Sequence, residues 1–166
     1  WQEELKTADL VINLAGITIF HYWTKAHKKL IYDSRILTTR NLVDALPEDR
    51  EVVFFSTSAL GYFGTRGDDE LVEDEPAGSG FLAEVCRDWE KEALEASRKN
   101  ARVMIGRFST VVDKSGGAMK VMLPPYRFFV GGPMGSGQQW FPWIHLSDLL
   151  AAIRFLLNKE GAKGIY

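Results

Sequence analysis

The sequence lacks the features of a disulfide-rich, membrane-spanning or nucleic-acid-binding protein. It has one cysteine, Cys86, which excludes an internal disulfide and fits a reducing compartment, so we expect a cytoplasmic protein. No apolar run approaches the roughly 20 residues that span a bilayer, and no signal peptide is visible. A formal net charge of -2 gives no electrostatic reason to bind nucleic acid or an anionic membrane.

Several site motifs are also missing. His21 and His27 have no other histidine or cysteine near them in the sequence, so we predict no metal site. There is no internal repeat and no phosphate-binding Gly-x-x-x-x-Gly-Lys-Ser/Thr motif. The 166 residues, 46% hydrophobic and 25% charged, instead suit one globular domain with a real core.

Hydrophobic patterns predict alternating strands and helices. Short apolar runs predict strands at Leu10–Gly16, about Val52–Ser58 and Arg102–Gly106, and helical spacing predicts helices from about Thr24 to Leu46 and Phe81 to Lys99. Because strands alternate with helices, we expect an α/β fold with parallel strands and right-handed crossovers.

The two helices each carry an apolar stripe. Thr24 is a suitable N-cap for the first, and Pro47 lies just beyond its end. In the second helix, Cys86 and Trp89 belong to the stripe, so Cys86 is predicted to be a core thiol. The stripe of the first helix comprises Ile36, Thr39, Val43 and Leu46, and that of the second comprises Leu82, Val85, Cys86, Trp89, Ala93 and Ala96. The charged residues of the second helix lie mostly off its stripe: Glu84, Arg87, Asp88, Glu90 and Lys91.

Polar residues end each predicted strand, where open α/β sheets bind their ligands. Asn13 is a polar amide in an apolar strand, so it must be hydrogen-bonded, either bracing neighbouring strands or anchoring the loop below a ligand. The second strand ends in hydroxyl residues, and Arg107 ends the third. The hydroxyl residues are Ser56, Thr57, Ser58 and, shortly after, Tyr62. The alternative is a strand that runs into an ordinary polar loop.

The loop from Gly64 to Gly80 is rich in glycine and carboxylates. We expect its acidic side chains to be solvated rather than paired for acid/base chemistry. Since loops over the carboxyl edge of a sheet often cover substrates, this loop is a candidate lid.

The last third of the chain changes character. A short helix is predicted from Ala118 to Leu123, stopped by Pro124-Pro125, and a final helix is predicted with Ser147 as its N-cap and Asp148 in its first turn. Between them, a glycine-rich segment precedes Trp140, Phe141, Trp143 and His145, which form either a ligand wall or a satellite aromatic cluster that caps the sheet. Leu149, Ile153, Leu156 and Leu157 give the final helix a buried face.

Both ends of the chain suggest a piece of a longer protein. The chain starts at Trp1, and Lys163–Tyr166 has the pattern of the first residues of a strand. We therefore expect a fragment.

Four blocks of sequence resemble the extended short-chain dehydrogenase/reductase superfamily, and more closely its atypical NAD-dependent epimerase/dehydratase branch, sometimes labelled cell-division-inhibitor-like. The blocks are Asn13-Leu-Ala-Gly16, Asp33-Ser-Arg-Ile36 with Thr38-Thr39, Ser56-Thr-Ser-Ala-Leu-Gly-Tyr62, and the segment from Gly132 to His145. The phrase Phe81-Leu-Ala-Glu-Val-Cys-Arg-Asp-Trp-Glu90 also matches the branch.

The resemblance implies a Rossmann-like doubly wound parallel sheet that binds NADP or NAD, with NADP preferred. It makes residues 1–113 the C-terminal half of the Rossmann domain, and 114–166 a substrate-side segment with the final helix, packed on the same domain. The strands seen here would be the fourth to sixth of the sheet, so the first βαβ half and its glycine fingerprint are missing. The implied cofactor-side residues are Asn13, Ala15, Gly16, Ser56, Thr57 and Arg107.

The family usually catalyses with Tyr-x-x-x-Lys on the helix after its fifth strand, but Leu82 and Cys86 occupy those positions here. Neither can replace the pair, because leucine transfers no proton and cysteine supplies no fixed positive charge. We therefore predict an atypical oxidoreductase or epimerase/dehydratase that acts on a small molecule, with Ser58 polarising the substrate and Tyr62 or His145 supplying the proton.

The predicted substrate wall comprises Gly135, Ser136, Gln139, Trp140 and Trp143. The alternative function is a non-catalytic, cofactor-dependent binding or regulatory protein. A bare strand at the sheet edge would also invite pairing with a second copy, as a homodimer.

Overall fold

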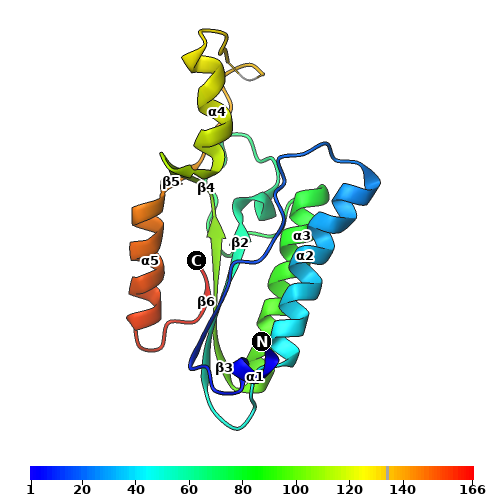
Figure 1. The fold of residues 1–166 in the computed structure, drawn as a ribbon, viewed down its shortest axis with the longest axis vertical. Coiled ribbons are helices and arrows are strands. Elements are labelled where there is room, and N and C mark those ends of the chain that lie inside the picture. The colour runs from blue at the N-terminus through cyan, green and yellow to red at the C-terminus, as the bar shows by residue number, and fades with distance from the viewer. Residues whose placement is uncertain (134) are drawn as a thin grey trace. The chain divides into compact units, whose positions relative to one another are not determined.

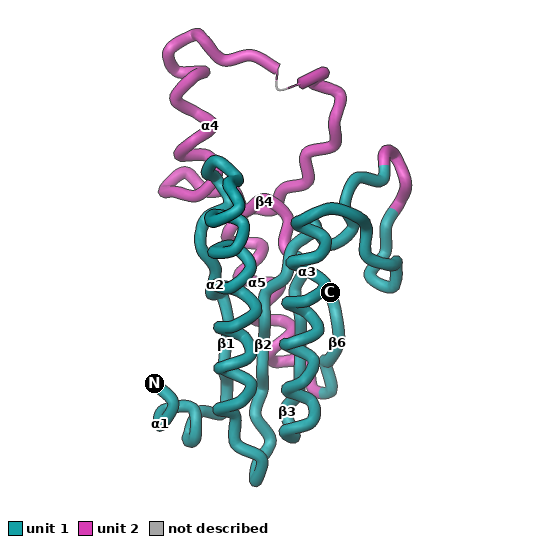
Figure 2. Tube along the Cα trace, turned by 90° about the vertical axis from the view of Figure 1, so that its right-hand side faces the viewer, with its two compact units in different colours: residues 1–66, 71–107, 161–166 teal, residues 67–70, 108–160 magenta. Residues whose placement is uncertain are grey.

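A computed structural model describes residues 1–133 and 135–166 of the chain. These residues form two compact units, coloured separately in Figure 2. Unit 1 comprises Trp1–Arg66, Leu71–Arg107 and Gly161–Tyr166, and unit 2 comprises Gly67–Glu70 and Phe108–Glu160. Residue 134, within the glycine-rich block, lies outside the described residues.

Unit 1 is built on a four-stranded sheet with the strand order β1-β2-β3-β6 (Figure 1). The strands are β1 (Leu10–Asn13), β2 (Val52–Ala59), β3 (Ala101–Phe108) and β6 (Gly164–Ile165). β1 pairs with β2 in parallel, and β3 pairs in parallel with β6. The predicted α/β class with a parallel sheet is confirmed, as is the expectation of a strand at the end of the chain.

Two long helices cover one face of this sheet. α2 (Lys25–Asp44) and α3 (Phe81–Leu94) lie side by side in Figures 1 and 2. Thr24 is the N-cap of α2, as predicted, and its hydroxyl accepts a hydrogen bond from the His27 amide at 3.1 Å. Shorter elements complete the unit: α1 (Gln2–Leu5) and the 3-10 helices η1 (Leu60–Phe63) and η2 (Glu95–Lys99).

The core of unit 1 lies between the sheet and these two helices. Val52 and Phe54 of β2 are fully buried and pack with Ala93 and Ala96, which follow the predicted stripe. The stripe prediction was wrong at one position, because Glu90 is only 4% exposed rather than solvated. Its carboxylate lies one helical turn before Ala93 on the same face, where it has polar partners.

A buried polar network joins both helices to the first two strands. The Asn13 amide donates to the Thr39 hydroxyl of α2 at 2.8 Å and to the Ser56 hydroxyl at 3.3 Å, and Trp89 of α3 donates to the same Thr39 oxygen at 2.9 Å. The side-chain oxygen of Asn13 accepts from the Ala15 amide at 3.1 Å. Asn13 therefore does both things that its sequence allowed: it braces neighbouring elements, and it anchors the loop that follows β1.

Unit 2 contains a two-stranded parallel sheet and two helices. Its elements are β4 (Thr110–Asp113), α4 (Gly117–Arg127), β5 (Trp143–His145) and α5 (Leu146–Asn158). Leu149 is the buried residue of α5, and Ile153, Leu156 and Leu157 are half-buried, on the predicted face. Among the described residues of both units, no helix combines the length and apolar character that a membrane crossing requires.

Two boundaries in unit 2 differ from the sequence prediction. α4 continues through Pro124 and Pro125, because their carbonyl oxygens still accept from the Phe128 and Val130 amides at 3.1 and 3.0 Å. His145, rather than Ser147, is the N-cap of α5, and its ring accepts from the Ser147 amide. A hydroxyl residue near a helix start is a common cap, but here an imidazole two residues earlier takes that position.

We expect Asn13→Ala to lower the free energy of unfolding by roughly 1–3 kcal/mol, because it leaves buried partners in the network unsatisfied. Urea denaturation monitored by tryptophan fluorescence would measure the change. Asn41→Ala, on the exposed side of α2, is the matched control and should stay within about 0.5 kcal/mol of the parent. Equal midpoints for the parent and Asn13→Ala would contradict the role given to this amide.

Candidate functional site

The ends of β1 and β2 bring Asn13, Ser56 and Thr57 together. The register places Asn13 opposite Ser56, and the Thr57 hydroxyl donates to the Asn13 carbonyl at 3.2 Å. All three are buried. The carboxyl edge of the sheet is therefore a fixed polar surface, and its hydroxyl and amide groups are held by one another.

Arg35 of α2 supports the loop that follows β1. Its guanidinium donates to the Ile17 carbonyl at 3.1 Å and lies 5.4 Å from the centre of the Trp89 ring. A Cβ atom on Gly16 would lie 2.9 Å from the Arg35 Cζ atom, so this glycine lets the guanidinium pack under the loop. The contact with Arg35 thus explains the small size of Gly16 without a ligand.

A second polar group joins β2, α3 and β3 around one carboxylate. The Ser58 hydroxyl donates to Glu90 Oε1 at 2.5 Å, and Arg107 donates to Oε1 and Oε2 at 2.9 Å each. Ser58 is 3% exposed, and both charged side chains are buried. We call Ser58, Glu90 and Arg107 the carboxylate hub.

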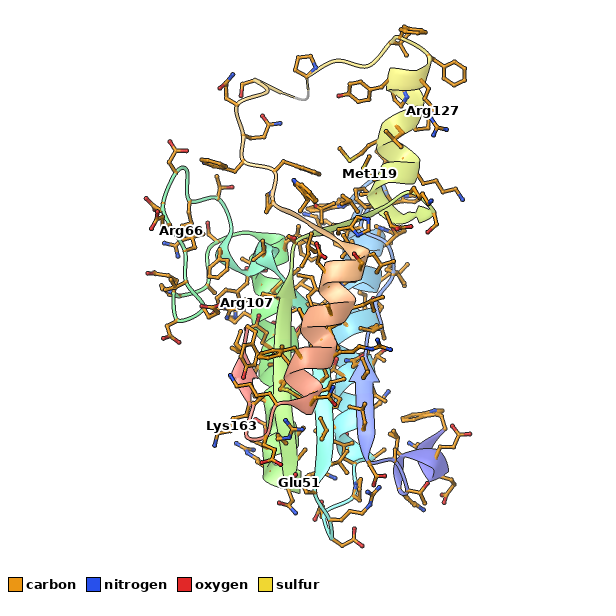
Figure 3. All side chains as sticks on the ribbon, turned by 90° about the vertical axis from the view of Figure 1, so that its left-hand side faces the viewer. Glu51, Arg66, Arg107, Met119, Arg127 and Lys163 are labelled. Carbon is orange, nitrogen blue, oxygen red and sulfur yellow. The ribbon has the colours of Figure 1, made fainter. Side chains whose placement is uncertain are left out.

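Arg107 extends from the hub to the residues after β2 (Figure 3). Its guanidinium lies 3.6 Å from the centre of the Tyr62 ring and donates to the Glu73 carbonyl at 2.7 Å. Burial alone would lower the pKa of Arg107, but the hydrogen bonds and charge of Glu90 outweigh burial and raise it. Arg107 was predicted to face the cofactor. In the structure its guanidinium donates hydrogen bonds to Glu90 and to the Glu73 carbonyl.

Residues 71–80 are tied to η1, which weakens the idea of a freely hinged lid for this part of the loop. The Gly78 amide donates to the Tyr62 carbonyl at 2.8 Å, and Arg66 donates to the Pro76 carbonyl at 2.9 Å. A Cβ atom on Gly78 would lie 2.0 Å from the Phe63 carbonyl oxygen, so no side chain fits there. This stretch is better described as an anchored wall beside Tyr62.

Cys86 lies in the buried layer beside the hub, as its place in the stripe predicted. Burial first, and the charge of Glu90 second, raise the pKa of the thiol to about 11, while the Ala59 backbone and the Ser58 hydroxyl act in the opposite direction. Gly61 of η1 packs on the thiol and on Leu82. The two positions where the family usually carries tyrosine and lysine are thus filled by apolar packing.

His145 belongs to unit 2, and each of its ring nitrogens has a polar neighbour. Nδ1 accepts from the Ser147 amide at 3.2 Å, so the neutral ring carries its proton on Nε2, which lies 4.0 Å from an Asp113 carboxylate oxygen. Hydrogen bonds from Ser115 are the main cause that lowers the pKa of Asp113. Because Nε2 already carries the proton of the neutral ring, this ring can take up a second proton only at Nδ1, and doing so would break the helix cap.

The predicted substrate wall also belongs to unit 2. Gly135 has a φ of 58°, and the Ser136 hydroxyl accepts from the Gln138 amide at 3.3 Å, so these residues form a turn just before Gln139. Trp140 and Trp143 are 76% and 61% exposed, and the Trp140 indole donates to Asp68 at 2.7 Å. These exposed rings are not a packed aromatic cluster. Among the described residues, no group of three or more His, Cys, Asp or Glu side chains is arranged to hold a metal ion.

Sequence reasoning missed Glu90 and Arg35, although both left a signal. Glu90 follows Cys86 by four residues and precedes Ala93 by three, which places it on the buried face of α3. Arg35 adjoins Ile36 and follows Ile31 by four residues, beside the buried stripe of α2. In both cases the charge of the side chain suggested that it would be exposed to solvent, whereas its spacing along the helix indicated a buried position.

We expect Arg107→Met to lower the free energy of unfolding by about 3–5 kcal/mol, because it leaves the buried Glu90 carboxylate without its cation. Urea denaturation at neutral pH would measure the loss. Arg40→Met is the control: Arg40 pairs with Glu92 at the surface, and its loss should cost less than about 1 kcal/mol. Similar losses for both variants would show that the hub contributes no more than a surface pair.

Cys86 should add a specific component to alkaline unfolding. The pKa of an unfolded cysteine is about 8.5, whereas the pKa of Cys86 in the folded protein is about 11. The neutral thiol therefore makes its full contribution to the free energy of unfolding below the pKa of the unfolded state. That contribution is lost as the pH rises toward the pKa of the folded state. At about 1.4 kcal/mol per pH unit, the parent should lose roughly 3 kcal/mol more than Cys86→Ala over this range. Urea denaturation of both proteins from pH 7 to 11 tests this, and parallel curves would contradict it.

Comparisons with known proteins relate this geometry to a family. A curated relative, the "Epimerase family protein SDR39U1 homolog, chloroplastic" of Arabidopsis thaliana, is 42% identical over 169 residues, which covers 99% of this chain and 48% of the relative. The "Epimerase family protein SH2119" of Staphylococcus haemolyticus is 40% identical, with coverages of 99% and 56%. The chain spans about half the length of these curated relatives.

Solved structures agree with the sequence comparison. The crystal structure of human epimerase family protein SDR39U1 (isoform2) with NADPH matches with a TM-score of 0.84 and 30% identity, covering 99% of this chain and 59% of that one. A nucleoside-diphosphate sugar epimerase from Corynebacterium glutamicum matches with a TM-score of 0.83 and 34% identity, covering 99% and 35%. The profile of the NAD dependent epimerase/dehydratase family matches residues 1–166. The chain belongs to the NAD dependent epimerase/dehydratase family.

Proposed function

We propose that this chain supplies the nicotinamide side of an NADP- or NAD-dependent oxidoreductase or epimerase-like enzyme of atypical mechanism. The observation that carries the proposal is the polar carboxyl edge of β1 and β2, in a chain that matches the family throughout. Ligands of open α/β sheets bind at this edge. NADP is preferred because the human relative was crystallised with NADPH.

The residues present fit such a cofactor. The side chains of Asn13, Ser56 and Thr57 bring amide and hydroxyl groups to this edge, and the loop through Ala15 and Gly16 follows it directly. Arg107 acts from behind this layer through Glu90. The cofactor would supply hydride transfer, and the protein's own groups would orient it and exclude water.

We propose that Ser58 polarises the substrate and that either Tyr62 or His145 supplies the proton. Residues 1–113 would serve the cofactor and 114–166 the substrate, a small molecule that meets Gly135, Ser136, Gln139, Trp140 and Trp143. The single Cys86 supports a reducing compartment such as the cytoplasm. β1 ends the strand order of the described sheet, and this edge position supports the proposal of pairing with a second copy.

A second candidate is a non-catalytic protein that binds the cofactor as a regulatory ligand. Leu82 and Cys86 favour it, because they pack on Gly61 where the family's proton-transferring pair would lie. The Ser58 hydroxyl, which already donates to Glu90, favours it too. This candidate shares cofactor binding with the first and differs in turnover.

Titration of NADPH and NADH into the complete natural protein, followed by nicotinamide fluorescence, tests both candidates. We expect saturable binding, tighter for NADPH. Consumption of NADPH with a panel of ketones, or conversion of nucleotide sugars followed by product analysis, would favour the enzyme, and binding without turnover would favour the regulatory protein. A folded protein that binds neither dinucleotide would refute both proposals.

A further inference from the structure

Every hydrogen-bond partner that the hub gives to the Glu90 carboxylate is a donor. Glu90 Oε1 receives the Ser58 hydroxyl and Arg107 Nε, and Oε2 receives Arg107 Nη2. A protonated carboxyl group would have to donate at one of these oxygens, whereas an ionised one accepts at both. The hydrogen-bond pattern therefore describes an ionised Glu90 with its charge matched by Arg107.

This arrangement fixes the direction of the Ser58 hydroxyl. A serine hydroxyl has one proton and two lone pairs, and the 2.5 Å contact with Glu90 uses the proton. Hydrogen bonds to an ionised acceptor are about twice as strong as neutral ones, so a neutral ligand carbonyl competes poorly for that proton. What Ser58 can offer beyond the hub is a lone pair.

Arg107 keeps the arrangement from relaxing. Its third donor holds the Glu73 carbonyl and its face lies on Tyr62, so the guanidinium has little freedom to turn away from Glu90. If the Ser58 hydroxyl turned away, it would give up a charge-assisted hydrogen bond and leave the buried Glu90 carboxylate with one donor fewer, which is costly. The hub therefore resists reorientation when a ligand arrives.

We propose that Glu90 is a positioning residue that locks the Ser58 proton inward, so that Ser58 meets a bound ligand only as a hydrogen-bond acceptor. The inference rests on the proposed function and revises the role that it gives to Ser58. Ser58 then selects a ligand group that donates, an alcohol O–H or an amide N–H, rather than polarising a carbonyl. The task of donating a proton passes to another group of the site.

Proton NMR of the complete natural protein tests the lock, using NADPH as the probe. We expect a downfield, slowly exchanging hydroxyl resonance that disappears in Ser58→Ala and moves upfield in Glu90→Gln. It should persist when NADPH saturates the protein. Glu84→Gln, on the exposed side of α3, is the matched control and should leave the resonance unchanged.

The Cys86 thiol gives a second readout of the Glu90 charge. Because that charge helps to raise the pKa of Cys86, Glu90→Gln should speed alkylation at pH 8, by roughly tenfold for each unit by which the thiol pKa falls. The Cys86→Ser protein gives the background rate, and Glu84→Gln should match the parent. If Glu90→Gln does not fold, the parent and Ser58→Ala spectra still decide the matter.

The inference is overturned if the parent shows no such resonance, if the resonance ignores Glu90→Gln, or if NADPH abolishes it, since the proton would then have turned to the ligand. NADPH fluorescence on the same samples separates the two proposals. Absent NADPH binding refutes the proposed function, while the spectra of the free protein still decide whether Glu90 holds Ser58.

Discussion

The interaction on which the site depends is the buried pair of Glu90 and Arg107. Two charges leave water here, and their mutual attraction offsets that cost only if the remaining donors and acceptors are satisfied as well. Ser58 and the Glu73 carbonyl supply those partners. One electrostatic requirement thus fixes the end of β2, the start of the anchored wall and the buried face of α3 together.

One face of β2 carries apolar core residues in its first half and hydrogen-bonding hydroxyl groups in its second half. Val52 and Phe54 of β2 pack into the apolar core, and Ser56 and Ser58, further along the same face, enter the Asn13 network and the carboxylate hub. Because side chains alternate along a strand, these four residues lie in one row. The apolar half holds the strand rigidly, and that rigidity places the hydroxyl groups.

Much of this could be predicted from the sequence, because the responsible forces act locally. Apolar runs predicted the strands, and Thr24 predicted the start of α2. Both signals depend on residues that are close together in the sequence. Glu90 could not be placed by its chemistry, because its burial depends on Arg107, which comes from another strand. The course of α4 through its prolines and the imidazole cap of α5 likewise depend on bonds that local preference does not decide.

The shielded thiol of Cys86 also has a practical consequence. A cysteine that is 4% exposed, with a pKa of about 11, carries almost no thiolate near neutral pH. A new cysteine engineered at an exposed position of this chain would therefore react with maleimide dyes far faster than the native one. Pairs of dyes could therefore be attached at chosen surface positions without first removing Cys86.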